Sequence, residues 1–402
     1  MDWRIIVLYV ARGVRGFGDG FAVITLPAYL ATIGYSAAQI GVVAAVSLLG
    51  TALLTLAVGF IAPRHEIRSL LMAGAGLVAF TGLAFPNVEH FILISAVAFI
   101  GTINPMGGDL GVLVPLEHAM LAQSVEAGRR TNAFARYSLI GALSLAAGSL
   151  AAALPDFLVP TGLSRVGAFK LMFYVYAGLG LLAAALYWRL PQVVMAESKP
   201  SVPLGPSRGV VVKLAALFSL DSFAGGFVVQ SLLTLWLFEK FDLSLSAASL
   251  FFFWASVATA FSYPVAAWLA HRIGLINTMV FTHIPSSVFL ILAAFAPNLY
   301  LVLALLLVRS ALAQMDVPAR TSYVMAVVTP AERTAAASLT AVPRSLATAI
   351  SPAIAGVLFT LPFWGLPLIL CGVLKIAYDL GLLYTFRHVK PPEEQSVAVS
   401  SA

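Results

Sequence analysis

Long apolar runs alternate with short groups of Gly, Pro and charged residues along the whole chain. Each run has the length of an α-helix that crosses a lipid bilayer, which is about 20 residues. Gly, Pro and charged groups place the helix ends. The pattern predicts twelve spanning helices, near residues 4–32, 37–61, 69–86, 89–116, 131–153, 169–190, 210–238, 246–270, 275–295, 299–326, 334–360 and 365–386. We therefore expect an all-α polytopic membrane protein.

The longest polar, Pro-rich stretch divides these helices into two sets of six. It covers residues 191–209 and is interpreted as a cytoplasmic linker. The linker would join an N-terminal bundle (1–190) to a C-terminal bundle (210–386), which a polar cytoplasmic tail (387–402) follows.

The two sets of helices also resemble each other in sequence. The matching dipeptides are Gly20-Phe21 with Gly226-Phe227, Val114-Pro115 with Val317-Pro318, and Arg130-Thr131 with Arg333-Thr334. The last two matches share an offset of 203 residues. A duplicated six-helix unit in parallel orientation is the architecture of one large class of transporters.

Composition strengthens the membrane interpretation. The chain is 60% hydrophobic and only 10% charged, whereas soluble domains carry about 25% charged residues. The first apolar run holds three charges and lacks a small-residue cleavage site, so it predicts a transmembrane helix and not a signal peptide. The single cysteine, Cys371, excludes disulfides within the chain and Cys-based metal sites.

The distribution of Lys and Arg predicts the orientation. Thirteen of these residues fall on one predicted side of the membrane, against three on the other, Arg165, Lys170 and Lys240. The positive-inside rule then puts both termini and the linker in the cytoplasm of a multi-pass protein of the cell membrane. Basic residues at helix ends also explain the pI near 9.5 without a nucleic-acid partner, and none is expected.

The loop after the second predicted helix carries a family signature. It reads Gly59-Phe-Ile-Ala-Pro63-Arg64-His-Glu-Ile-Arg68 and is similar to the G-x-x-x-D-R-x-G-R-R/K motif of the major facilitator superfamily. Gly59, Arg64 and Arg68 are in place, whereas Pro63 stands where the family has Asp. The corresponding loop in the second half keeps Arg-x-Gly but has His271 at the acidic position.

The chain resembles this superfamily over essentially its whole length. The resemblance implies two six-helix bundles that rock about a midplane site, a small-molecule substrate and a monomer in the lipid bilayer. The family's antiporter Gly-Pro motif is absent from the fifth span, which has Gly148-Ser149, and only Ser351-Pro352-Ala-Ile-Ala-Gly356 in the eleventh approaches it. Arg309 in the tenth span resembles the family's membrane arginine, which usually lies in the fourth span.

Thirteen ionisable residues lie within the apolar runs and away from their ends, counting Glu117, one residue past the fourth predicted span. A charge at the bilayer centre costs roughly 2.5–3.5 kcal/mol, so these side chains must face one another or a wet cavity. They are Arg12, Arg15, Asp19, Asp109, Glu117, Arg136, Asp221, Arg309, Asp316, Arg320, Arg344, Lys375 and Asp379.

Five residues are candidates for substrate binding. Arg12, Arg15 and Asp19 form one stripe on the first helix, either as an anion-attracting patch or as an internally neutralised structural group. Asn104 lies where Pro and paired Gly weaken the fourth helix, a feature of transporter sites. Arg309, near the middle of the tenth, would be a second substrate-facing cation or a tether between helices.

Four carboxylates are candidates for proton coupling, because desolvation suits a carboxylate to take up a proton. These are Asp19, Asp109, Asp221 and Asp316. His283 and His118 could also titrate, although a lone membrane histidine is more often a packing residue. We interpret Lys375 and Asp379, four residues apart, as a structural pair.

The internal repeat suggests gating pairs. Aligning the halves sets Arg15 opposite Asp221 and Glu117 opposite Arg320, so both pseudo-equivalent positions carry swapped charges. The hypothesis is that Glu117 and Arg320 form a cytoplasmic gate, with Arg15 and Asp221 in a similar role nearer the site. The alternative is coincidence in the alignment. Arg64 of the signature loop is a further gating candidate.

No P-loop, His-Glu-x-x-His motif or nucleophile elbow occurs, so we expect neither an enzyme nor a cofactor or metal. The sequence favours a secondary transporter that moves a small polar or anionic organic solute by alternating access, with proton-coupled export as the first hypothesis. Uptake or anion exchange is the nearest alternative. A non-transporting receptor or a lipid flippase on the same scaffold is the alternative of another class.

Overall fold

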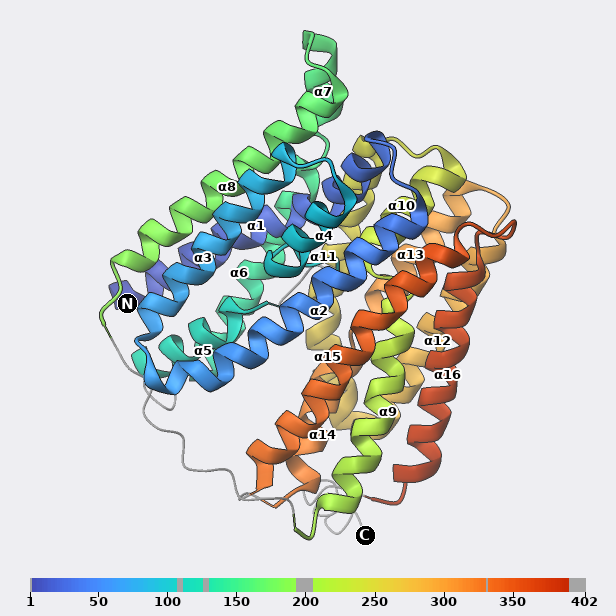
Figure 1. The fold of residues 1–402 in the computed structure, drawn as a ribbon. Coiled ribbons are helices and arrows are strands. Elements are labelled where there is room, and N and C mark those ends of the chain that lie inside the picture. The colour runs from blue at the N-terminus through green and yellow to red at the C-terminus, as the bar shows by residue number, and fades with distance from the viewer. Residues whose placement is uncertain (1, 107–110, 126–129, 193–204, 330–331, 390–402) are drawn as a thin grey trace. The chain divides into compact units, whose positions relative to one another are not determined.

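The computed structural model describes residues 2–106, 111–125, 130–192, 205–329 and 332–389, and these ranges are helical with no strand among them (Figure 1). In the first half the helices are α1 (Trp3–Thr32), α2 (Ala37–Ile61), α3 (Ile67–Ala84), α4 (Phe91–Ile100), α5 (Leu113–Ser124), α6 (Arg130–Ala151), α7 (Leu154–Leu158) and α8 (Arg165–Trp188). In the second they are α9 (Arg208–Gly226), α10 (Gln230–Phe241), α11 (Leu245–Ile273), α12 (Leu275–Phe295), α13 (Leu299–Leu312), α14 (Asp316–Val327), α15 (Arg333–Leu358) and α16 (Leu366–Phe386).

These helices confirm the all-α prediction of twelve spans. Ten segments of the described chain are long and apolar enough to cross a membrane, and α1 and the α4–α5 pair complete the set. Large apolar side chains such as Phe60, Phe261 and Tyr300 remain exposed on the helices, as expected of surfaces that face lipid.

Three of the predicted spans are each divided into two helices. The fourth is interrupted between α4 and α5, where Pro105 and neighbouring glycines weaken the helix as predicted. The seventh breaks after Gly225-Gly226, between α9 and α10, and the tenth breaks between α13 and α14. These two breaks were not predicted. Pro318 lies in the first turn of α14, where its missing N–H leaves no helical hydrogen bond unmade.

Packing divides the chain into two compact units. Unit 1 comprises Met1–Ser198, Val229–Val257 and Pro352–Pro362, and unit 2 comprises Lys199–Val228, Ala258–Ser351 and Phe363–Ala402. Two segments from the second half thus pack with the first six spans. The bundle boundaries expected from the sequence, 1–190 and 210–386, stay a prediction.

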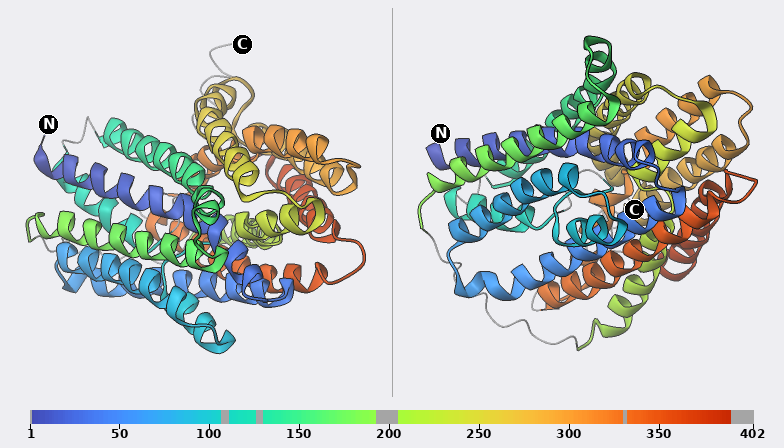
Figure 2. Two further views of the ribbon diagram at one scale, coloured as in Figure 1. Left: turned by 90° about the horizontal axis from the view of Figure 1, so that it is seen from above. Right: turned by 45° about the horizontal axis from the view of Figure 1, so that its top comes forward.

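In unit 1, α1 is the central helix. It packs against α6 and α8, and these three helices lie together in both further views (Figure 2). Glycines allow the close approach: a Cβ at Gly20 would lie 2.1 Å from the Leu145 carbonyl oxygen, and one at Gly148 would lie 2.0 Å from that of Phe17. This contact fixes the side chains of α1 against the rest of the unit.

In unit 2, α12 packs against α13, α14 and α16, while α9 packs against α16. The core is apolar and includes Phe218, Met279, Tyr323 and Tyr378.

The carboxylate of Glu332 holds the residues that immediately precede α9. Glu332 accepts hydrogen bonds from the hydroxyls of Ser207 (2.6 Å) and Thr329 (2.7 Å) and from the Gly205 N–H. These hydrogen bonds, led by the Ser207 hydroxyl, lower the pKa of Glu332 to about 2. The carboxylate thereby ties the start of α9 to the loop before α15.

Candidate functional site

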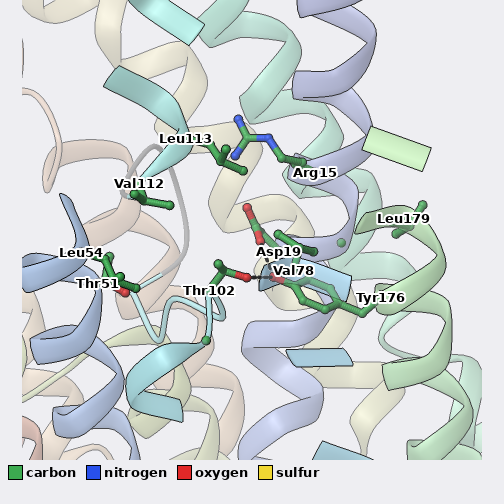
Figure 3. Close-up of a pocket in the computed structure, with 13 residues that line it drawn as sticks. Arg15, Asp19, Thr51, Leu54, Val78, Thr102, Val112, Leu113, Tyr176 and Leu179 are labelled. Carbon is green, nitrogen blue, oxygen red and sulfur yellow. Dashed lines mark hydrogen bonds between the residues drawn. The ribbon is translucent and has the colours of Figure 1, made fainter. Parts of the chain in front are cut away.

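A cavity opens in unit 1 beside the interrupted fourth span. Its walls come from α1, α2, α3, α5, α8 and the residues between α4 and α5, and the space open to a water-sized molecule is about 30 Å³ (Figure 3). Polar lining residues are Arg15, Asp19, Thr51, Thr102 and Tyr176. The broken helix therefore leaves a polar hollow inside an otherwise apolar bundle.

Two hydroxyl groups in sequence lead to the Asp19 carboxylate in this cavity. The Tyr176 hydroxyl donates to Asp19 Oδ1 over 3.2 Å, and the Thr102 hydroxyl lies 3.3 Å from that of Tyr176 (Figure 3). Asp19 itself remains half-buried, whereas Tyr176 is buried. The second carboxylate oxygen of Asp19 accepts no hydrogen bond from the described residues and is open to a further donor.

Arg15 is held by a buried carboxylate on the other side. Its guanidinium donates to Glu117 Oε2 from α5, and the same carboxylate accepts from the hydroxyls of Tyr137 and Tyr187. Glu117 is fully buried. Three donors on one carboxylate compensate the cost of burying its charge. The cluster therefore joins α5 to α1, α6 and α8 and supports the cavity wall at Arg15.

The remaining substrate candidates of unit 1 differ in position. Arg12 does not line the cavity, because its guanidinium lies over the Tyr137 ring at 5.3 Å. Asn104 is buried, and its Oδ1 accepts from the Met106 N–H over 2.9 Å, which shapes the turn after α4. Asp109, a predicted proton-coupling residue, lies outside the described residues.

Unit 2 contains a chain of charged side chains from α9, α12, α14 and α16. Asp221 accepts from Lys375 (2.6 Å) through Oδ1 and from Arg320 (3.1 Å) through Oδ2. Arg320 also pairs with Asp316 over 3.1 Å. At the other end, Lys375 Nζ lies 3.2 Å from His283 Nε2. The chain brings two of the predicted proton-coupling carboxylates to one place.

The last helix contributes differently from the prediction. Lys375 pairs with Asp221 on α9, and Asp379 pairs with His283 on α12, whose Nδ1 lies 3.0 Å from Asp379 Oδ2. The structural pair of Lys375 with Asp379 was therefore wrong. Partners on neighbouring helices replace an intrahelical contact because the two side chains turn toward a buried polar centre.

Arg309 and Asp316 also do not pair. Asp316 binds Arg320 one turn further along α14. The Arg309 side chain, near the end of α13, is half-buried and makes no hydrogen bond or ion pair with another side chain in the described parts of the chain. Its role in substrate binding stays a prediction.

The charge-swapped positions of the repeat receive a structural explanation. Arg15 pairs with Glu117 inside unit 1, and Asp221 pairs with Arg320 inside unit 2. Each half therefore holds the same pair, from its first and fourth spans, with the signs reversed. The gate proposed for Glu117 and Arg320 stays a prediction, and in this structure each of them has a partner in its own unit.

The signature loop has a role in packing. Arg68 donates to the Leu190 carbonyl over 3.3 Å and lies over the Trp188 ring at 5.5 Å, which links α3 to the end of α8. Arg64 is exposed, and its gating role stays a prediction. Arg136, counted among the thirteen intramembrane charges, is exposed.

Sequence reasoning missed the aromatic hydroxyls and undervalued one histidine. Tyr137, Tyr176 and Tyr187 are buried donors to carboxylates, and His283 bridges Lys375 and Asp379. A tyrosine in an apolar run gives no signal of its own, because it also serves as an apolar filler or an interfacial residue.

Comparison with known proteins agrees with this architecture. The model of the Major Facilitator Superfamily matches residues 8–220 and 214–401. A Saccharomyces cerevisiae relative, the uncharacterized membrane protein YJR124C, is 23% identical over 423 residues, covering 96% of this chain and 94% of the relative.

Solved transporters share the fold at low sequence identity. The nucleoside transporter NupG is 15% identical with a TM-score of 0.75, covering 96% of this chain and 100% of that chain. The inward-open xylose transporter XylE from E. coli is 16% identical with a TM-score of 0.73, covering 95% of each chain. The helices, the duplicated charge pairs and the family match over both halves lead to one conclusion: the chain belongs to the major facilitator superfamily.

Proposed function

We propose that the protein is a proton-coupled secondary transporter that exports a small polar or anionic organic solute by alternating access. The observation that carries the proposal is the cavity beside the broken fourth span, with Arg15 and Asp19 on its wall. Interrupted helices around a central cavity are typical of transporter sites. The nucleoside and xylose substrates named for two solved neighbours are also small and polar.

The charges of the cavity favour a solute with both donor and acceptor groups. Arg15 offers a guanidinium to an acceptor or an anion, while the open oxygen of Asp19 accepts from a hydroxyl or an amine. A proton on Asp19 would compete with such a donor for the same oxygen. That competition is the exchange an exporter needs, since a proton entering would displace the solute.

Arg309 in unit 2 supports the anionic part of the proposal. A desolvated cation without a protein counter-charge attracts a carboxylate, a phosphate or a strongly polar oxygen. Its position in the last turn of α13, next to the break before α14, also follows the pattern of broken spans at transport sites.

The cellular setting is inferred from the Lys and Arg distribution. We place both termini in the cytoplasm and the protein, as a monomer, in the cell membrane, because basic residues gather on the side of the linker.

Ligand-induced thermal stabilisation of the purified protein tests substrate binding. A library of metabolites and drugs is screened at an acidic and a neutral pH against wild type, Arg309→Gln and the control Arg136→Gln, whose side chain is exposed. We expect stabilisation by an anionic or polar compound that R309Q weakens and R136Q leaves intact. Stabilisation that ignores R309Q would contradict a substrate-facing Arg309.

The role of Asp19 is tested by Asp19→Asn, with Asp242→Asn as its matched control. Asp242 is exposed and has a positive φ of 49°, a conformation that Asn also adopts. D19N should bind ligand with no dependence on pH, whereas D242N should behave as wild type. Proteoliposomes with an imposed proton gradient then report the direction of transport. Solute movement opposite to the proton flow supports export, and movement in the same direction as the protons indicates uptake. No solute movement at all would favour a receptor.

A further inference from the structure

The polar centre of unit 2 imposes a tautomer on His283. The Lys375 ammonium has only donors, so His283 Nε2, 3.2 Å from Nζ, must accept. The proton of the neutral ring is then on Nδ1 and donates to Asp379, whose oxygens lie 3.0 and 3.1 Å away. A lone packing histidine needs only one such partner, whereas this ring is held at both nitrogens.

The connected charges around this ring are unbalanced while the ring is neutral. His283 is buried, and α12 packs against α13, α14 and α16, with α9 packed against α16. The charged or titratable groups near the centre are Asp221, Arg309, Asp316, Arg320, Cys371, Lys375, Tyr378 and Asp379 on these helices, and Arg344 of α15, which donates to Ser222 over 3.1 Å. Within the connected chain three carboxylates meet Lys375 and Arg320, and one further proton makes that sum neutral.

The geometry points to a proton-binding site formed by His283 and Asp379, in which proton uptake exchanges the partner of Asp221. This inference deepens the proposed proton coupling and rests on it. A proton from water that binds His283 Nε2 breaks the hydrogen bond from Lys375, because two donors then face each other. The new N–H has an acceptor close by, since Asp221 Oδ1 lies 3.8 Å from Nε2.

The exchange transmits protonation to other helices. Lys375 holds Asp221 at 2.6 Å, and its release leaves Asp221 bound by Arg320 and the protonated ring. Lys375 sits on α16 and Asp221 on α9, so the contact between these helices changes with the proton. The site is separate from Asp19, which belongs to unit 1.

Histidine-selective ¹⁵N NMR of the purified full-length protein tests the site directly, because the chain has only six histidines. His283→Gln identifies the resonance by its loss, and His65→Gln, at an exposed histidine, serves as the control. We expect the Nδ1–H tautomer at neutral pH and one titration on acidification. In Asp379→Asn the ring loses its carboxylate acceptor at Nδ1, so the balance of the Nδ1–H and Nε2–H tautomers at neutral pH should shift.

Two results would overturn the site: a His283 that keeps one protonation state over the whole pH range of the folded protein, or a tautomer balance unchanged in D379N. Transport gives an independent readout. His283→Gln should lose accumulation driven by a proton gradient while keeping solute counterflow. If H283Q retains both activities, the proposal is overturned. Because NMR needs no substrate, a titrating His283 in a protein that moves no solute would refute the transport function alone.

Discussion

Replacing Glu117 with Gln isolates the electrostatic contribution of the buried pair in unit 1. Glutamine keeps the shape of the side chain and an oxygen that still accepts from Tyr137 or Tyr187. It removes the negative charge, however, and leaves the Arg15 guanidinium, only 7% exposed, without its counter-ion. The dominant effect is therefore an uncompensated buried charge and not a cavity.

The expected cost is large. Removing one partner of a buried ion pair destabilises a protein by about 3–5 kcal/mol. In a thermal unfolding assay in detergent this corresponds to a fall in melting temperature on the order of 10 °C. The control Tyr187→Phe removes only one hydroxyl donor from the carboxylate, and hydrogen bonds to charged groups contribute about 1.5–3 kcal/mol. We therefore expect E117Q to be clearly less stable than Y187F.

A double variant provides the decisive comparison. In Arg15→Gln with Glu117→Gln no charge is left unpaired, so the double variant should recover most of the stability that E117Q loses. A melting temperature of E117Q equal to that of wild type would refute the argument. So would a double variant in which the two losses simply add, because the guanidinium and the carboxylate would then contribute independently.

Three further predictions use other contacts. The double variant Arg15→Glu with Glu117→Arg should restore the transport that either single reversal loses. The double variant Glu117→Arg with Arg320→Glu should restore transport only if Glu117 and Arg320 form the gate. Transport measured in proteoliposomes distinguishes the two pairs. Wild type should lose stability relative to Glu332→Gln as pH falls from about 4.5 toward about 2. A carboxylate whose pKa is lowered on folding stabilises the folded protein above its unfolded-state pKa, and this stabilisation is lost when the carboxylate is protonated. Equal dependence of stability on pH in the two proteins would contradict this prediction. Gly356→Leu should block transport, since even a Cβ there would lie 2.7 Å from the Ala37 carbonyl oxygen; normal transport would show that this contact opens freely.

The fold could be predicted because hydrophobic length alone determines it. A span needs about 20 apolar residues whatever its neighbours are, so the ends of α1 and α2 agree with the predicted 4–32 and 37–61 to within a residue. Breaks were predictable only where several weak signals coincide, as around Asn104-Pro105. The breaks after Gly226 and before Asp316 carry weaker signals, because Gly pairs also occur within packed membrane helices.

The composition of the site could be predicted, but its pairing could not. The sequence identified Arg15, Asp19 and Asp221 as buried charges because they cannot face lipid. It could not give their partners, since these depend on how each helix is rotated against its neighbours. Lys375 and Asp379 illustrate this: their spacing of four residues predicted an intrahelical pair, which is worth only about 0.2–0.5 kcal/mol on a helix surface. Their desolvated interhelical partners outweigh it.

The reversed pairs show that a duplicated scaffold can hold two chemically different centres. In each half the first and fourth spans are joined by one ion pair, whose sign is free to reverse provided that both members change. One turn further along, the symmetry ends. The alignment that matches Gly20 with Gly226 places Gly225 opposite Asp19, and a Cβ at Gly225 would lie 3.9 Å from Lys375 Nζ.

At this aligned position unit 1 has a carboxylate that accepts from a tyrosine hydroxyl, whereas unit 2 has a glycine beside the Lys375 ammonium. Asp19 receives its hydroxyl from α8, the sixth span, and Lys375 comes from α16, the twelfth. A glycine on α9 leaves room for the lysine, and in unit 1 the Tyr176 hydroxyl on α8 donates to the aspartate. The proposed sites therefore differ between the halves: Asp19 is proposed for the solute in unit 1, and His283 with Asp379 for a proton in unit 2. Coupling between two different ligands requires such distinct sites.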